Sequence, residues 1–440
     1  MLGCLRTMEL SDQMFYSLFL FIWLLYLWEE YLAYKQRCMY RAAHDVPEEL
    51  QAVLPRETYI KASVYQLEHA RLESLHALFT QLESTAILLL GGIPYLWDFS
   101  GRLLSSFEYG PEYEISQSAI FLLLASLYSW LVGLPWSVYS TFVVEERHGF
   151  NKQTAGFFVK DKLKKFAVTE AILLPVSCLL LHVIKLGGEN FFIYAWLFVC
   201  IVSLVLVTIY ADYIAPLFDN FKPLPEGPLR EAIESLAKRL SFPLTKIYVV
   251  DGSRRSAHSN AYFYGFYKNK RIVLFDTLLQ QEGDTEKGCT QDEILAVLCH
   301  ELGHWNYQHT LKHIVFSQMN LFFCFLLFQT LMGWPELFSA FGFHSEYPVL
   351  IGMLLTFQFA LAPYNTMVGF AAVAISRRFE RQADQFARGM GHGKHLLAAL
   401  LRLNATNLGF PEADPLYSIW HHTHPTLLER IRALGGKKDN

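Results

Sequence analysis

Two histidines and a glutamate in one short stretch, 300-HELGH-304, have the spacing that metal-assisted hydrolysis requires. On a helix, residues four apart lie on the same face one turn apart, so His300 and His304 can bind one metal ion. Glu301 lies beside them, where a carboxylate can accept a proton from a water molecule activated by that metal. The pattern therefore indicates a zinc hydrolase.

A catalytic zinc ion needs a third protein ligand and one open position. The longer pattern with a third histidine six residues further on is absent, because Thr310 stands at that place. The best candidate is Glu380 in 376-SRRFERQADQFA-387, which we expect at the start of an amphipathic helix. Asp384 follows on the same face, where it can orient a ligand histidine. The alternative for Glu380 is a solvated surface carboxylate among arginines.

The composition predicts that these residues belong to a membrane protein. The 440 residues are 52% hydrophobic and only 18% charged, and the net charge of −4 argues against a nucleic-acid partner. A membrane-spanning helix needs about 20 apolar residues. Seven stretches meet that length: Met14–Tyr34, Leu78–Trp97, Ile120–Phe142, Phe166–Lys185, Phe191–Ile214, His313–Trp334 and Tyr347–Ser376.

The charges of the connecting segments predict how these spans are oriented. Lysine and arginine are concentrated in residues 35–71 and 147–165, whereas residues 335–346 contain neither. Because basic segments favour the cytoplasmic side, the N-terminus is expected in the lumen and the C-terminus in the cytosol. Two spans separate His304 from Glu380, so both residues lie on the cytosolic side, where they can meet.

The soluble stretches divide the chain into four parts. Residues 1–214 hold spans one to five, and residues 313–376 hold spans six and seven. Residues 215–312 form a cytosolic part with a helix, strand-like segments and the HELGH helix, and residues 377–440 form the second cytosolic part. The expected elements of the first cytosolic part are the helix Leu229–Leu240 and the strands Lys246–Val250 and Arg271–Phe275.

Several stretches together resemble the type I CAAX prenyl proteases, the polytopic zinc metalloproteases that mature farnesylated a-factor and prelamin A. The resemblance covers nearly the whole chain and departs mainly in a shorter loop at residues 281–291. Besides the HELGH helix and the later ExxxD helix, the matching stretches are 91-GGIPYLW-97, 145-EERHGFN-151, 208-TIYADYIAPLFD-219, 258-HSNAYFYGF-266, 406-TNLGFP-411 and 422-HTHPTLLERI-431.

The resemblance implies roles for further residues. It assigns one Zn²⁺ per chain to His300, His304 and Glu380, with Glu301 as the catalytic base and Asp384 behind the ligands. His424 and Arg430 would reach the site to stabilise the oxyanion or to hold substrate. Asn260 and Ala261 would lie on an edge strand that pairs with the substrate backbone. For His424 the alternative is a surface cluster, 421-HHTH-424.

The resemblance also implies a fold and an activity. The expected fold is an all-α polytopic membrane protein whose seven transmembrane helices enclose a water-filled intramembrane chamber. A cytosol-facing zincin-like metalloprotease domain with a small β-sheet caps that chamber. The implied reaction removes the last three residues of prenylated (farnesylated) CAAX proteins, with a second upstream cut in precursors such as a-factor or prelamin A.

The implied location is the endoplasmic reticulum membrane, extending to the inner nuclear membrane. The terminal 437-KKDN-440 resembles a dilysine retrieval signal, with a solvated basic tail as the alternative. Two other functions stay open at this point. A quality-control zinc protease for misfolded or translocon-stalled proteins would share every metal residue and would cleave without prenylation. A channel, transporter or scaffold with an incidental HExxH would bind no zinc.

Overall fold

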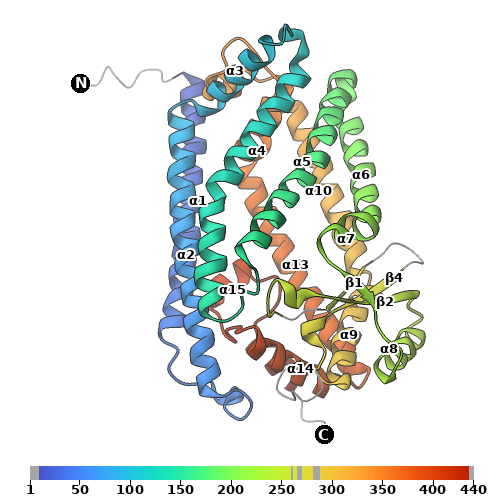
Figure 1. The fold of residues 1–440 in the computed structure, drawn as a ribbon. Coiled ribbons are helices and arrows are strands. Elements are labelled where there is room, and N and C mark those ends of the chain that lie inside the picture. Colours follow the sequence, from blue (N-terminus) through green and yellow to red (C-terminus); the bar gives the residue numbers. More distant parts are fainter. Residues whose placement is uncertain (1–8, 259–260, 265–269, 281–287, 436–440) are drawn as a thin grey trace.

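The chain folds into a bundle of long helices with a small mixed sheet at one end. The computed structural model describes residues 9–258, 261–264, 270–280 and 288–435. Figure 1 shows the sheet, α9 and α14 together at the end of the bundle opposite α3. The long helices of the bundle are α1 (Leu10–Arg41), α2 (Arg56–Leu89), α4 (Glu114–Tyr139), α5 (Ala155–Leu186), α6 (Phe191–Ile209), α10 (His309–Met332) and α13 (Ala362–Gly389).

The membrane-spanning segments agree with the predicted ones in number but not in continuity. Within the described residues, five helical segments are by themselves long and apolar enough to cross a membrane, and two bent helix pairs raise the total to seven. The five unbroken segments are Leu10–Arg41, Glu114–Glu145, Ala155–Leu186, Gly188–Ile209 and His309–Met332.

The second predicted span is not one straight helix. The chain bends by 67° between α2 and α3 (Gly92–Ser105). Gly91 takes a left-handed conformation (φ 66°) at that bend, which a glycine adopts without the steric cost of a Cβ atom. The prediction of a continuous helix over Leu78–Trp97 is therefore wrong, because hydropathy reports apolar length and not the direction of the backbone.

The seventh predicted span is likewise broken. It consists of α12 (Val349–Leu354), a π-helical segment (Leu355–Ala360) and α13, with a bend of 62°. Pro363 lies in the first turn of α13. Proline is favourable at the start of a helix, but it interrupts a helix that comes before it because it has no backbone N–H to donate. Glu380 therefore lies in the second half of a 28-residue helix, and the prediction that it opens a new helix is wrong.

A four-stranded sheet lies beside the membrane helices, with the strand order β1-β2-β4-β3. The strands are β1 (Phe221–Pro223), β2 (Leu244–Val250), β3 (Ala261–Tyr264) and β4 (Lys270–Phe275). β2 and β4 are parallel, whereas β3 is antiparallel to β4 and forms one edge of the sheet. The two central strands were expected from their apolar residues. The three-residue β1 was not, since it is too short to show a period of two.

Helices α8 (Pro228–Arg239) and α9 (Gln291–Asn306) pack against this sheet. Their apolar faces form one core with the strands, in which Ile233, Ile272 and Leu298 are almost completely buried. On the far side, α9 packs against α13 and α14 (Gly393–Thr406). The HELGH helix is therefore held on several sides, which fixes the side chains that it presents.

Ion pairs join the sheet region to the ends of the membrane helices. Arg255 binds Asp161 of α5 and Asp219, which follows α7 (Ala215–Phe218). Arg271 of β4 binds Asp212, in a π-helical segment that continues α6. Because these carboxylates belong to the ends of spans, the position of the sheet is tied to the membrane part of the molecule.

Candidate metal centre

The helix that carries the HELGH motif is well defined at its start. Thr290 and Glu293 form a capping box, in which each side chain accepts a hydrogen bond from the other residue's backbone N–H. Gly303 is required by the packing of α9 on α13. A Cβ atom at this position would lie 3.1 Å from Phe386 Cδ1 and 3.3 Å from the Cα atom of Ala383. The glycine thus lets the two helices approach closely enough for their polar side chains to meet.

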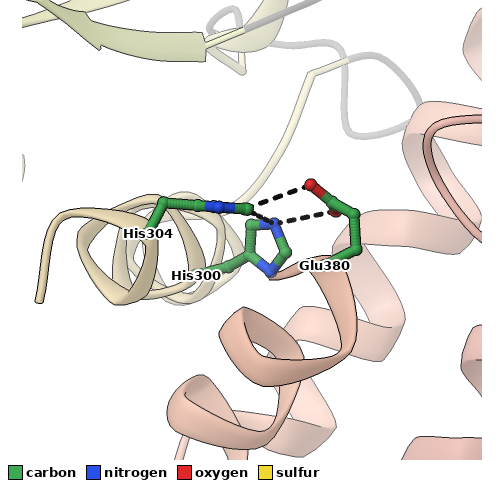
Figure 2. A group of neighbouring side chains, drawn as sticks. All are labelled: His300, His304 and Glu380. Atoms are coloured by element: carbon green, nitrogen blue, oxygen red, sulfur yellow. Dashed lines mark hydrogen bonds and ion pairs between the residues drawn. The ribbon is translucent and has the colours of Figure 1, made fainter. Parts of the chain in front are cut away.

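His300, His304 and Glu380 converge between these two helices, as Figure 2 shows. The Nε2 atoms of the two histidines are 3.3 Å apart. Nε2 of His300 lies 3.4 Å from Glu380 Oε2, and Nε2 of His304 lies 3.1 Å from Glu380 Oε1. In the part of the chain that the structure describes, this is the one group of three such ligands that could hold a metal ion.

The geometry of these atoms fits a tetrahedral zinc ion. Ligand atoms about 2.05 Å from such an ion lie about 3.3 Å from one another. This is close to the separation of the two Nε2 atoms and to the distance from each Nε2 to one of the two Glu380 oxygens. In addition, Glu380 Oε2 is buried without a hydrogen-bond partner. A buried carboxylate oxygen is costly unless a donor or a cation faces it. The three side chains therefore suit a metal ion better than they suit one another.

Asp384 lies behind His300 and extends the site away from the cavity. Its Oδ1 is 2.9 Å from His300 Nδ1, on the side of the ring opposite the metal position. Arg430, in α16 (Leu427–Gly435), donates two hydrogen bonds to Asp384, at 2.9 and 2.6 Å. Asp384 is 3% exposed, so this bidentate pair supplies a buried carboxylate with its counter-charge.

Two carboxylates raise the proton affinity of the first histidine. Burial alone would lower the pKa of His300, but Asp384 and Glu380 raise it to about 9. In the absence of metal the two carboxylates therefore favour the protonated ring. Because a metal ion binds only the neutral ring, protons compete with metal, and metal affinity falls as the pH is lowered.

His309 contacts the second histidine of the motif, His304, and the HELGH motif alone does not predict this contact. His309 Nδ1 lies 3.0 Å from His304 Nδ1, and His309 Nε2 lies 3.0 Å from Gln382 Oε1. If Nε2 of His304 binds the metal, its Nδ1–H donates to His309, whose own Nε2–H donates to Gln382. The ring of His309 also stacks on Phe379 at 4.0 Å. These contacts fix the orientation of the His304 ring, as a residue behind a metal ligand would.

Glu301 faces the cavity that contains the metal position. This cavity has a volume of about 660 Å³, and Glu301, His304, Glu380 and His424 all line it. Burial raises the pKa of Glu301, while the nearby His300 and His304 act in the opposite direction. A carboxylate with a raised pKa, next to a position for activated water, has the properties of a general base.

The remaining predicted residues take different positions. His424 Nε2 lies 3.3 Å from Glu380 Oε1, although the side chain is 65% exposed. Its neighbour His421 instead pairs with Glu29 of α1. Ala261 lies on the edge strand β3, which contacts α9. Asn260 lies outside the described residues.

Part of the lining of this cavity is an apolar wall. It comes from the end of α6, the π-helical segment after it and the edge strand β3, so a membrane helix contributes to the cavity that contains the metal position. No signal in the HELGH motif points to this wall. Its residues are Leu206, Val207, Tyr210 and Phe263.

Comparison with known proteins finds similarity over nearly the whole chain. A family model described as CAAX prenyl protease N-terminal, five membrane helices, matches residues 35–220, and that of peptidase family M48 matches residues 223–438. The human CAAX prenyl protease 1 homolog is 54% identical, covering 100% of this chain and 99% of its own. CAAX prenyl protease 1 of Saccharomyces cerevisiae is 36% identical, over 92% of each chain. The crystal structure of S. mikatae Ste24p has a TM-score of 0.87 at 35% identity, covering 98% of this chain and 100% of its own.

Proposed function

Since the chain belongs to peptidase family M48 and, within it, to the CAAX prenyl proteases, we propose that it removes the last three residues of prenylated CAAX proteins at His300, His304 and Glu380. It is a multi-pass membrane protein and a zinc metalloprotease. The observation that carries the proposal is the convergence of these three ligands on a cavity that Glu301 also faces.

The side chains around the metal position divide the catalytic work. When bound, a zinc ion supplies Lewis acidity, which lowers the pKa of water and polarises a peptide carbonyl. Glu301 accepts the proton of the attacking water and returns it to the leaving amine. His424, exposed on the cavity side of Glu380, donates to the oxyanion as negative charge develops.

Behind the ligands, two further residues act by holding position. Asp384, whose Oδ1 lies 2.9 Å from His300 Nδ1, fixes the ring with Nε2 toward the metal. Arg430 neutralises Asp384 through its two hydrogen bonds. We therefore assign Arg430 an effect on the metal site through Asp384, in place of direct contact with the oxyanion.

The lining of the cavity suits a substrate that is both peptide and lipid. It includes the polar groups of Glu301, Glu380 and His424 as well as Leu206 and Val207 from a membrane helix. A prenylated cysteine next to the cleaved bond needs apolar surroundings within a few ångströms of the catalytic groups. β3 lies close by and offers an edge strand to the peptide, with Ala261 and Asn260 as the contact positions.

Replacement of Val207 by tryptophan tests this assignment of the apolar wall. The larger side chain is expected to lower kcat/KM for a farnesylated peptide about tenfold, because it fills space that the isoprenoid needs. A geranylgeranylated peptide, longer by one isoprene unit, should lose more. Val205→Trp is the matched control, since residue 205 points about 200° away around α6. Equal losses for both variants, or for both lipids, would contradict the assignment.

The soluble parts, residues 215–312 and 377–440, form the catalytic unit in this proposal, and residues 1–214 and 313–376 anchor it in the membrane. Residues 35–71, in which lysine and arginine are concentrated, comprise the end of α1, the loop that follows and the start of α2, and they lie at the same end of the molecule as α9 (Figure 1). Basic segments favour the cytosolic side of a membrane. In this proposal the site therefore lies on the cytosolic side of the endoplasmic reticulum membrane, or on the nucleoplasmic side of the inner nuclear membrane. A second, upstream cleavage of precursors such as a-factor or prelamin A would use the same metal ligands and Glu301.

Purified protein and a farnesylated peptide ending in a CAAX sequence test the function. Mass spectrometry should detect release of the last three residues, which stops on addition of a chelator and returns with Zn²⁺. The same peptide without its lipid should be cleaved far more slowly. Equal cleavage of both peptides would favour the quality-control protease, and a lack of bound zinc would favour a channel or scaffold.

A further inference from the structure

A partly buried carboxylate outside the metal centre joins three separate segments of the chain. Glu145 ends the π-helical segment Ser140–Glu145 that continues α4. Its Oε1 accepts a hydrogen bond from the hydroxyl of Tyr65 at 2.8 Å and lies 2.9 Å from His69 Nε2, both residues of α2. Its Oε2 lies 3.6 Å from His258 Nε2. Such π-helical turns often occur at functional positions, because they redirect the side chains that follow.

Further contacts hold His258 to the loop after α4 and to the segment after β4. Its ring stacks on Phe150 with centroids 4.2 Å apart and planes 14° apart. The backbone carbonyl of His258 accepts a hydrogen bond from Thr277 Oγ1 at 3.0 Å.

Backbone hydrogen bonds add to this connection. The N–H of Ala257 donates to the carbonyl of Phe150 at 3.3 Å, and the N–H of Lys152 donates to the carbonyl of Arg255 at 3.3 Å. Asn151 and Ser256 form an isolated antiparallel bridge. Residues 255–258 therefore form a short ladder with residues 150–152, and Glu145 closes one end of that ladder through His258.

This ladder precedes the edge strand of the sheet. Three residues after His258 the chain enters β3 at Ala261, whose partner within the sheet is β4. An edge strand is held by one neighbouring strand, so its entry point has a large influence on where it lies. The ladder supplies that entry point, and it ties the strand to α2 and to the loop after α4, which belong to the membrane part.

We propose that Glu145 is a positioning residue for substrate binding, which holds β3 at the correct distance from the metal centre through His258. The inference rests on the proposed function, because β3 matters in this way only if substrate pairs with it. In this proposal Glu145 takes no part in the chemical step. It fixes the strand through charge-assisted contacts, which have a stronger orienting effect than contacts between neutral groups.

Glu145→Gln tests the proposal with the farnesylated peptide. The amide keeps the size of the side chain but removes its charge, so β3 should be held less precisely. KM is expected to rise about tenfold while kcat changes by less than about twofold, as for a loss of uniform binding. Zinc content should stay at the wild-type value. Glu68→Gln is the matched control, because Glu68 also ties α2 to this loop, through Arg147 and His148, and it should keep the wild-type KM.

A second substrate separates strand positioning from general loss of structure. A peptide N-methylated at the residue before the prenylated cysteine loses one backbone hydrogen bond to the strand. Its penalty in kcat/KM should be smaller in Glu145→Gln than in the wild type, since the two changes disrupt the same interaction. A merely structural role predicts equal penalties in both proteins.

His258→Phe gives an independent variant if Glu145→Gln folds poorly, because phenylalanine keeps the stacking on Phe150 and removes the contact with Glu145. It should reproduce the increase in KM. A wild-type KM in both variants, or equal N-methyl penalties, overturns the inference even if wild-type cleavage is prenyl-dependent and chelator-sensitive. Loss of those two wild-type properties would instead overturn the proposed function.

Discussion

Replacement of Glu301 by glutamine is expected to leave zinc content unchanged and to lower kcat by about 10²–10⁴-fold. The proposed metal ligands are His300, His304 and Glu380, whose atoms already lie at suitable separations without any contribution from Glu301. Glutamine has nearly the same size as glutamate, but it cannot accept the proton of the attacking water. Metal analysis and steady-state kinetics on the same sample measure the two expectations together.

The interpretation of this variant depends on separating catalysis from binding. KM for the farnesylated peptide should change little, because Glu301 acts on water and not on the lipid or the peptide backbone. Glu293→Gln on the same helix is a control for the structural effect of removing a carboxylate, and it should keep nearly full activity. Loss of zinc together with activity in Glu301→Gln would contradict the division of roles, since it would make Glu301 a ligand.

Replacement of Glu380 by alanine is expected to cause the second large loss of activity, in this case through loss of zinc binding. The variant should lose its zinc at a chelator concentration that leaves the wild type loaded, and activity should fall in proportion to the bound metal. Two histidines alone provide too few ligands for a catalytic zinc ion. Excess Zn²⁺ should restore little activity, because the open position and the geometry both change.

Asp384→Asn provides the comparison for that result. The asparagine still contacts His300, but the charge that orients and polarises the ring is lost. Zinc affinity is expected to fall by about 10–100-fold, as is typical for residues behind a metal ligand. Activity should therefore return when Zn²⁺ is added in excess. If Asp384→Asn loses more zinc than Glu380→Ala, the assignment of the third ligand is wrong.

The location of the site follows from how the membrane helices end. α10 begins at His309, only a few residues after the HELGH motif, and α13 carries Glu380 beyond its apolar first half. A metal bound between α9 and α13 therefore lies where lipid-facing helices meet the soluble sheet. A catalytic helix that leads directly into a membrane span suits the proposed substrate, in which the prenylated cysteine carries a lipid and is part of the peptide.

Part of this protein could be predicted from the sequence because the relevant patterns are local. His300 and His304 are four residues apart, and a helix of 3.6 residues per turn brings them together whatever surrounds it. The apolar stretches predicted a polytopic membrane protein because their length alone matches the bilayer. The number of crossings then predicted that His304 and Glu380 lie on the same side, which their separation of 3.1 Å between Nε2 and Oε1 confirms.

Only the tertiary structure decided the features that depend on segments distant in the chain. The bends at Gly91 and after the π-helical segment Leu355–Ala360 left no trace in hydropathy. The contact of His309 with His304, the pair of Arg430 with Asp384, and the apolar wall from α6 likewise join residues whose sequence separation carries no periodic signal. A local period is set by the backbone of one helix, whereas these contacts are set by how several helices pack.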